Sequence, residues 1–159
     1  LVLVDRIACG DALKEKLEKR QGLYKYMRGE EIPFINGSVK LTDRQDEYDD
    51  VAQSDDKIII ASYGVAAVGI NIPRIFNLVL VEPGKSFVRV IQSIGRGIRK
   101  AKDKDFVQIW DVCSSTKYSK RHLAKRKSFY KDAKYDCTVK KVKMDDFSII
   151  EQITKQNEK

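Results

Sequence analysis

Two arginines that lie three residues apart, Arg96 and Arg99, are the side chains best suited to chemistry in this sequence. A guanidinium is always charged, and its planar fork of donors fits phosphate oxygens, so the pair predicts a clamp for a polyphosphate. Gly95 and Gly97 are expected to let the backbone turn sharply just past a helix and to let a partner approach closely. A solvated helix end that pairs with nearby carboxylates would contain the same arginines, and these residues alone leave both interpretations open.

A second stretch, Gly84-Lys85-Ser86, is similar to the end of a phosphate-binding P-loop. Such a loop requires a glycine at position 79, which is Val79 within an apolar run. The glycine-rich cradle is therefore absent from the chain. Ser86 is expected instead to cap a helix over 87–94 that leads into the turn of the two arginines.

The elements that position these residues follow from the hydrophobic pattern. Short apolar runs rich in β-branched residues are typical of strands buried on both faces of a parallel sheet. We expect strands at 1–4, 32–35, 57–61, 77–82 and 105–112, the last at a sheet edge because its residues alternate. We expect helices at 11–20, 42–52, 63–68, 87–94 and 119–134, with Thr42 and Gln45 forming a capping box. Strands interleaved with helices predict an α/β fold with an open, mostly parallel sheet flanked by helices.

Composition limits the class of protein. The chain has 159 residues, of which 42% are hydrophobic and 34% charged, as in a soluble globular domain. No apolar run reaches the ~18 residues of a membrane span. The three cysteines show no Cys-x-x-Cys spacing, so neither a zinc site nor a disulfide framework is indicated, and a reduced cytoplasmic setting is expected. The opening at Leu1, directly inside an apolar run, indicates a piece of a longer polypeptide.

Positive charge is concentrated near the C-terminus. Between positions 117 and 143, eleven Lys or Arg face only Asp132 and Asp136, a local charge of +9, whereas the whole chain carries +8. A solvated cationic helix is one interpretation, and contact with a phosphate backbone is the other.

A family resemblance rests on two motifs. The pattern Gln-x-x-Gly-Arg-x-x-Arg at 92–99 resembles motif VI of the superfamily 2 helicases. It follows a stretch similar to motif V, Ile60-Ala61-Ser62 to Val68-Gly69-Ile70-Asn71-Ile72-Pro73, and the likeness covers roughly residues 1–112 in order. The segments are most similar to phage recombination and repair helicases. The resemblance implies that the α/β fold is RecA-like, followed by a basic C-terminal helix extension.

At the nucleotide, the resemblance implies that Gln92, Arg96 and Arg99 are catalytic and that the two arginines are fingers reaching an ATP bound by another domain. Gly69 and Asn71 are implied to contact the same nucleotide. The family usually has Asp at position 71, and an Asn can still accept a ribose hydrogen bond although it lacks the charge. The Walker A lysine and the acidic DExH-type motif that holds Mg²⁺ are absent, so the isolated chain is predicted to be inactive.

At the nucleic acid, the resemblance implies that the loop after Gly37 and the start of the following helix face the phosphate backbone. Ser62 stands where the family usually has Thr, which contacts either the nucleic-acid backbone or the motif that couples binding to hydrolysis, and serine keeps the hydroxyl. The basic segment, in a chain that resembles a nucleic-acid motor, is expected to add further contacts. The predicted contacts are Gly37, Ser38, Lys40, Ser62, Lys120, Arg121, Lys127 and Lys131.

The resulting hypothesis is the C-terminal half of an ATP-dependent helicase or translocase that acts on branched or single-stranded DNA, or on RNA–DNA hybrids, in recombination, repair and replication. Its cofactor would be ATP with Mg²⁺, its partner the N-terminal RecA-like domain of the same polypeptide, and its state a monomer. We expect a helicase domain over 1–114, a basic helix–strand extension over 115–144 packing on it, with a strand near 138–142, and a flexible tail over 145–159. The alternatives are a stand-alone nucleic-acid binding module and the translocase segment of a restriction or remodelling enzyme.

Overall fold

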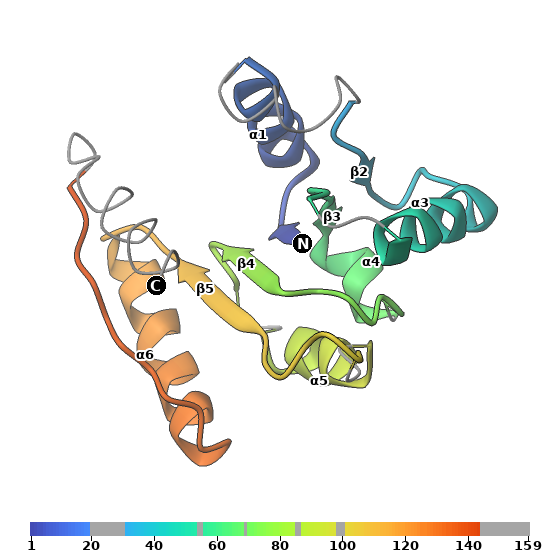
Figure 1. Cartoon of the computed structure of the whole chain (residues 1–159). Helices are drawn as coiled ribbons and strands as arrows, with labels where there is room; N and C mark the ends of the chain where they lie inside the picture. Colours follow the sequence, from blue (N-terminus) through green and yellow to red (C-terminus); the bar gives the residue numbers. More distant parts are fainter. Residues whose placement is uncertain (20–30, 54–55, 69, 85–86, 98–100, 144–159) are drawn as a thin grey trace. The chain divides into compact units, whose positions relative to one another are not determined.

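The computed structural model describes residues 1–19, 31–53, 56–68, 70–84, 87–97 and 101–143, apart from the side chains of Ile94 and Arg96. It contains two compact units, Leu1–Arg126 and Lys127–Lys159, and each is considered by itself. Strands and helices alternate through the first unit (Figure 1).

A five-stranded sheet forms the centre of the first unit (Figure 1). Every pair of neighbouring strands is parallel. This arrangement confirms the predicted open α/β sheet, and β5 lies at an edge as its alternating residues predicted. Across the sheet the order is β2 (Phe34–Ile35), β3 (Ile60–Ser62), β1 (Val2–Val4), β4 (Asn77–Val81) and β5 (Gln108–Val112).

Helices cover both faces of this sheet. Crossovers between parallel strands are right-handed in nearly all proteins. The step from β1 to β2 moves one way across the sheet, and the later steps move the other way, so α1 covers one face and α3, α4 and α5 cover the other (Figure 1). The helices are α1 (Ile7–Lys19), α3 (Leu41–Gln53), α4 (Tyr63–Ala67), α5 (Phe87–Gly97) and, after the last strand, α6 (Lys117–Asp132).

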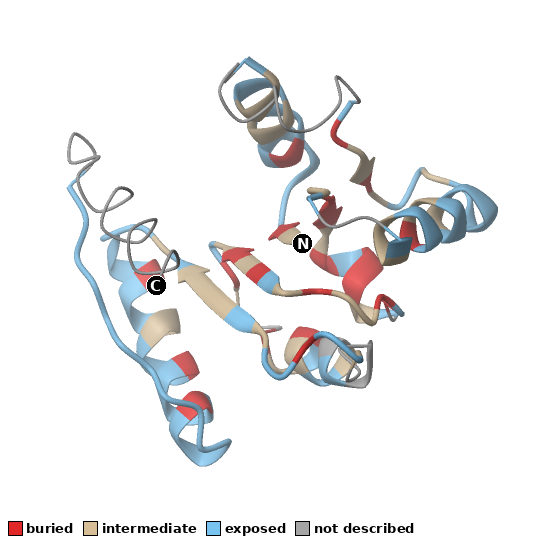
Figure 2. Ribbon diagram, in the orientation of Figure 1, coloured by how far each residue is buried: buried red, intermediate tan, exposed pale blue. Residues whose placement is uncertain are grey.

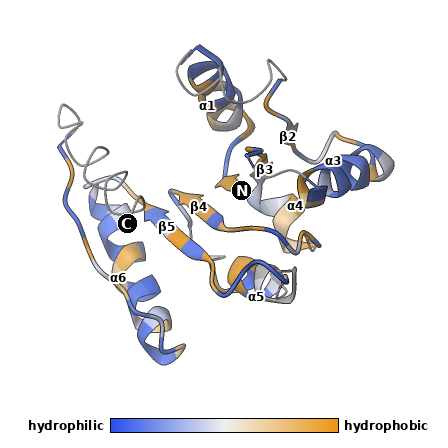
Figure 3. Ribbon diagram, viewed as in Figure 1, coloured by the Kyte–Doolittle hydropathy of each residue, from blue (hydrophilic) through white to orange (hydrophobic). Residues whose placement is uncertain are grey.

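Aliphatic side chains of the strands form the core. Leu3 and Val4 are adjacent in β1 and therefore point to opposite faces, yet both are 0% exposed. Burial on both faces explains why the strand segments read as continuous apolar runs. Buried residues gather in β4 and α4 (Figure 2), and the ribbon of α6 is largely hydrophilic (Figure 3).

Two local predictions in the first unit are wrong. The motif VI stretch is not a turn past a helix, because α5 continues through Gly95 to Gly97. The helix is amphipathic, and Phe87 and Val90 on its apolar face are only 3% and 2% exposed. The packing of this face stabilises the helix, and Gly95 and Gly97 adopt its conformation.

The capping box at the start of α3 is also wrong. The helix begins at Leu41, and the Thr42 hydroxyl donates to the side chain of Asp43 (3.2 Å) instead of accepting from a free amide. Arg44 instead ties the first turns of the helix to the preceding segment, because its guanidinium donates to the carbonyls of Asn36 (3.2 Å) and Val39 (2.9 Å).

The strand expected near 138–142 does not form. These residues carry no regular secondary structure, and every residue from 131 to 143 is exposed. Helix α6 ends in a Schellman motif, with Lys134 at φ 57° and hydrogen bonds from Lys134 N to Lys131 O (3.0 Å) and from Tyr135 N to Tyr130 O (2.9 Å). A strand needs a neighbour to pair with, and no described segment pairs with this stretch.

Candidate functional site

The carboxyl ends of β2 and β3 bring two of the predicted nucleic-acid contacts together. Ile35 pairs with Ala61, so the turn that follows β2 lies beside Ser62 at the end of β3. Ser62 is half-buried and caps α4, where its Oγ accepts from Val65 N (3.4 Å). Ligands of open α/β sheets bind at this edge.

The turn itself is held by side chains that the sequence reasoning did not single out. Asn36 Oδ1 accepts hydrogen bonds from Ser38 N (2.9 Å) and Ser38 Oγ (2.6 Å). Arg44 holds the other side through the backbone carbonyls of Asn36 and Gly37. Gly37, Ser38 and Lys40 are all exposed, and the amide and hydroxyl of Ser38 already donate to Asn36 Oδ1. An Asx-type pattern of Asn followed two residues later by Ser was the available sequence signal.

The segments that correspond to motifs V and VI are joined directly. Ser93 in α5 donates its hydroxyl hydrogen bond to the carbonyl of Ala67 at the end of α4 (3.0 Å), and it also contacts the carbonyl of Arg89 (2.9 Å). The two helices pack together along this contact. Gln92, next to Ser93, is exposed.

Of the other predicted nucleotide contacts, Asn71 is exposed in the loop that leads to β4. Arg96 lies within α5, one helical turn beyond Gln92, and its side chain is outside the described part of the structure. Gly69 and Arg99 also lie outside the described residues. The structure therefore positions the backbone of the motif VI helix and leaves the finger assignment as a prediction.

A second set of contacts joins the segments that precede β4 and β5. Arg74, three residues after Asn71, forms an ion pair with Asp103 (2.7 Å). Lys104 is only 7% exposed, and its ammonium donates a hydrogen bond to the carbonyl of Pro73. Burial lowers the pKa of Lys104, and the nearby Asp103 opposes this shift. These contacts join the end of the motif V stretch to Asp103 and Lys104, a few residues beyond the motif VI stretch.

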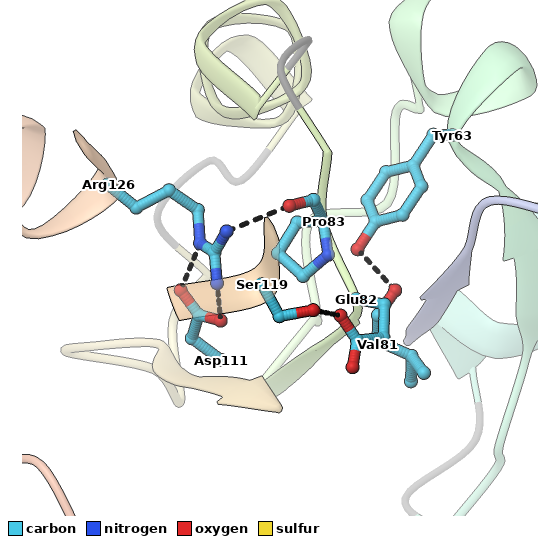
Figure 4. Close-up of polar contacts among 7 residues, drawn as sticks. All are labelled: Tyr63, Val81, Glu82, Pro83, Asp111, Ser119 and Arg126. Atoms are coloured by element: carbon cyan, nitrogen blue, oxygen red, sulfur yellow. Dashed lines mark hydrogen bonds and ion pairs between the residues drawn. The ribbon is translucent and has the colours of Figure 1, made fainter. Parts of the chain in front are cut away.

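A network of hydroxyl groups ties the end of β4 to the start of α6. Burial acts to raise the pKa of Glu82, but hydrogen bonds from Ser119 Oγ (2.6 Å) and from Ser114 outweigh it and keep the pKa below its ordinary value. Glu82 adopts φ 44°, an unusual conformation for a residue with a side chain. Nearby, Tyr63 donates to the carbonyl of Val81 (3.2 Å), and burial raises its pKa (Figure 4).

The sequence of this chain is similar to those of known helicases. The family model of the helicase conserved C-terminal domain matches residues 3–101. The chain belongs to this helicase family. A relative, the ATP-dependent DNA helicase uvsW of Enterobacteria phage T4, is 41% identical over 58 residues, which are 36% of this chain and 12% of that protein. A protein of the Sulfolobus islandicus filamentous virus (isolate Iceland/Hveragerdi) is 30% identical over 113 residues, 70% of this chain and 18% of that protein.

The fold of the helicase C-terminal domain is shown by solved structures as well. The C-terminal domain of the DEAD-box protein Dbp5 superposes with a TM-score of 0.67 at 22% identity, over 98% of this chain and 80% of that one. The likeness confirms the predicted RecA-like fold, and the family model confirms the resemblance to a helicase C-terminal domain. The present chain spans less than a fifth of the length of either sequence relative, 12% and 18% respectively.

The basic residues predicted on the last helix, α6, are all exposed. Lys120 and Arg121 belong to the first unit, and Lys127 and Lys131 belong to the second. Arg126, one residue before Lys127, is instead 2% exposed and bonds Asp111 (Figure 4). Sequence reasoning counted Arg126 only as part of the local charge, although it lies seven residues after the buried Ser119 and therefore on the same helix face.

No described helix is long and apolar enough to cross a membrane. Among the same residues, no group of three or more His, Cys, Asp or Glu is placed to hold a metal ion.

Proposed function

We propose that this chain is the C-terminal RecA-like half of an ATP-dependent helicase or translocase that acts on DNA. The observation that carries the proposal is the joining of the motif V and motif VI segments by Ser93 and Ala67, and again by Arg74 and Asp103. These contacts support the proposal because they tie the helix of Gln92 to α4 and join Asp103 to the segment before β4. Arginine fingers that reach a nucleotide held by a second domain would need such fixed elements, because a finger must be aimed accurately to be useful.

In the proposed mechanism, ATP with Mg²⁺ is bound by the N-terminal RecA-like domain of the same polypeptide. Arg96 and Arg99 supply positive charge where the transferred γ-phosphoryl group accumulates negative charge, and Gln92, Gly69 and Asn71 contact the nucleotide. This chain alone lacks the Walker A and DExH-type motifs, so it is proposed to be inactive without that domain.

Nucleic acid is proposed to lie along the carboxyl edge of β2 and β3. The exposed turn offers the ammonium of Lys40 and, in exchange for their hydrogen bonds to Asn36 Oδ1, the amide and hydroxyl of Ser38; Ser62 adds a second hydroxyl. These groups recognise a phosphate backbone without reading sequence. The exposed basic residues of α6 add salt-dependent attraction.

The substrate class proposed is branched DNA, such as forks and junctions, with RNA–DNA hybrids as a further substrate. Support comes from the relative in phage T4, which is named as an ATP-dependent DNA helicase. A role in recombination, repair and replication, a monomeric state and a cytoplasmic location remain predictions. A stand-alone binding module would instead keep its DNA affinity with no dependence on ATP.

The test is ATP hydrolysis by the full-length protein, with and without forked DNA. Arg96→Ala and Arg99→Ala should each lower DNA-stimulated turnover by about 10³-fold, the usual effect of a lost arginine finger. Arg89→Ala is the matched control, since Arg89 is an exposed arginine of α5 two turns earlier, and turnover should stay near the unmodified value. Unchanged turnover in both finger variants would refute the assignment.

A further inference from the structure

Arg126 is held by more partners than any other described arginine of the last helix. Its Nε donates to Asp111 Oδ2 (2.6 Å) and its Nη2 to Asp111 Oδ1 (2.8 Å), which is a bidentate pair. Its Nη1 donates to the carbonyl of Pro83 (2.8 Å), as Figure 4 shows. The side chain is 2% exposed, so these bonds form out of contact with water and hold the fork in one orientation.

The partners of this guanidinium belong to the elements that carry the motif VI helix. Asp111 lies in β5, and Pro83 lies in the connection from β4 to α5. The Arg126 Cζ also lies 5.8 Å from the ring centroid of Phe87, the first residue of α5. One side chain of α6 thus contacts both the connection before α5 and the beginning of α5.

A second contact from α6 reaches the same connection. Ser119 Oγ donates to Glu82 Oε2 (2.6 Å), and Glu82 directly precedes Pro83. Ser119 and Arg126 are seven residues apart and lie on one face of α6, with both side chains buried. On the remaining surface of this part of α6, Lys120, Arg121 and Lys125 are exposed.

We propose that Arg126 is a positioning residue that couples nucleic-acid contact on α6 to the placement of the motif VI helix α5. The inference rests on the proposed function, because it assumes that α6 contacts DNA and that α5 carries the fingers. A displacement of α6 by its ligand shifts Pro83 and Phe87 through the rigid guanidinium fork, and α5 moves with them. Lysine cannot reproduce this, since a single ammonium cannot bridge Asp111 and Pro83 with a planar fork.

The decisive variant is Arg126→Lys in the full-length protein. At saturating forked DNA, we expect kcat for ATP hydrolysis to fall by about 10-fold or more, because a small misplacement of catalytic groups is costly. DNA affinity without nucleotide should be unchanged. Coupling between two ligands is reciprocal, so a non-hydrolysable ATP analogue should tighten DNA binding by a smaller factor in the variant than in the unmodified protein. Fluorescence anisotropy of fluorescein-labelled DNA measures this factor.

The matched variant is Lys120→Ala, an exposed cation one residue after Ser119. It should weaken DNA binding and lower the magnitude of its log–log salt slope by about 1, as expected for one lost phosphate contact. The DNA concentration needed for half-maximal ATP hydrolysis should rise accordingly. The two variants therefore separate affinity from coupling.

Stability has to be measured alongside, since breaking a buried ion pair is destabilising. Thermal unfolding sets an assay temperature at which each variant is folded, and Asp111→Asn, which retains a hydrogen-bonding partner, provides a second route to the same loss of coupling. A folded Arg126→Lys or Asp111→Asn protein with normal kcat and normal ATP–DNA linkage overturns the inference. An unmodified protein that binds DNA but shows no DNA-stimulated hydrolysis overturns the proposed function itself, and the inference with it.

Discussion

Replacing Gly10 by alanine should separate the packing of α1 from its intrinsic helix stability. Gly10 is buried in α1, and a Cβ atom built there would lie 2.2 Å from Cζ of Phe34, with two further ring atoms at 2.5 and 2.6 Å. Phe34 begins β2, the strand that leads into the turn of Gly37 and Ser38. The ring or the helix must therefore move to accommodate a single methyl group.

Two terms of opposite sign set the magnitude. Overpacking of this kind costs about 1–3 kcal/mol. Alanine is favoured over glycine within a helix by about 1 kcal/mol. We expect a net loss of about 1 kcal/mol in the free energy of unfolding, which corresponds to a decrease in Tm of about 3 °C for a chain of this size.

Gly64→Ala is the matched control for this substitution. Gly64 is an exposed residue of α4, and the nearest atom to its added Cβ would be Ser62 Oγ at 4.0 Å. It should therefore gain stability where Gly10→Ala loses it. Urea unfolding of both variants, with Gly10→Ala repeated in a Phe34→Leu background, gives the comparison. Equal effects at the two glycines, or no recovery with Phe34→Leu, would refute the proposed clash.

Two further predictions concern charged groups. The pKa of Glu82 is lower in the folded protein than the ordinary Glu value of about 4.3. Ionised Glu82 should therefore stabilise the fold above that ordinary value, and this stabilisation should be lost as the pH falls through the lower folded pKa. Glu82→Gln should accordingly flatten the pH dependence of Tm below about pH 5. Arg74→Asp and Asp103→Arg should each reduce DNA-stimulated ATP hydrolysis, and the double variant, which exchanges the two charges, should restore it. Loss of the pair should change the free energy of unfolding by only about 0–1 kcal/mol, because the pair is partly exposed. Single variants that hydrolyse ATP normally would show that the pair does not position the motifs.

The sequence by itself determined the fold class and the order of the elements. Apolar runs such as that around Leu3 and Val4 have one stable environment, between two layers of helices, so local composition already specified a parallel sheet. The edge position of β5 followed from its alternating residues for the same reason. Motif spacing determined the family, because the residues at 60–73 and 92–99 keep their order and separation.

Only the tertiary structure decided which polar side chains hold the site together. Ser93, Arg44 and Lys104 read as ordinary surface residues in the sequence, yet each bonds a backbone carbonyl of another segment. Arg126 carries the same charge as the exposed Lys125 beside it, and its burial depends on Asp111 lying opposite in β5. A local pattern fixes which face of a helix is apolar, but a buried charge is decided by a partner distant in the chain, since only pairing offsets the cost of removing it from water.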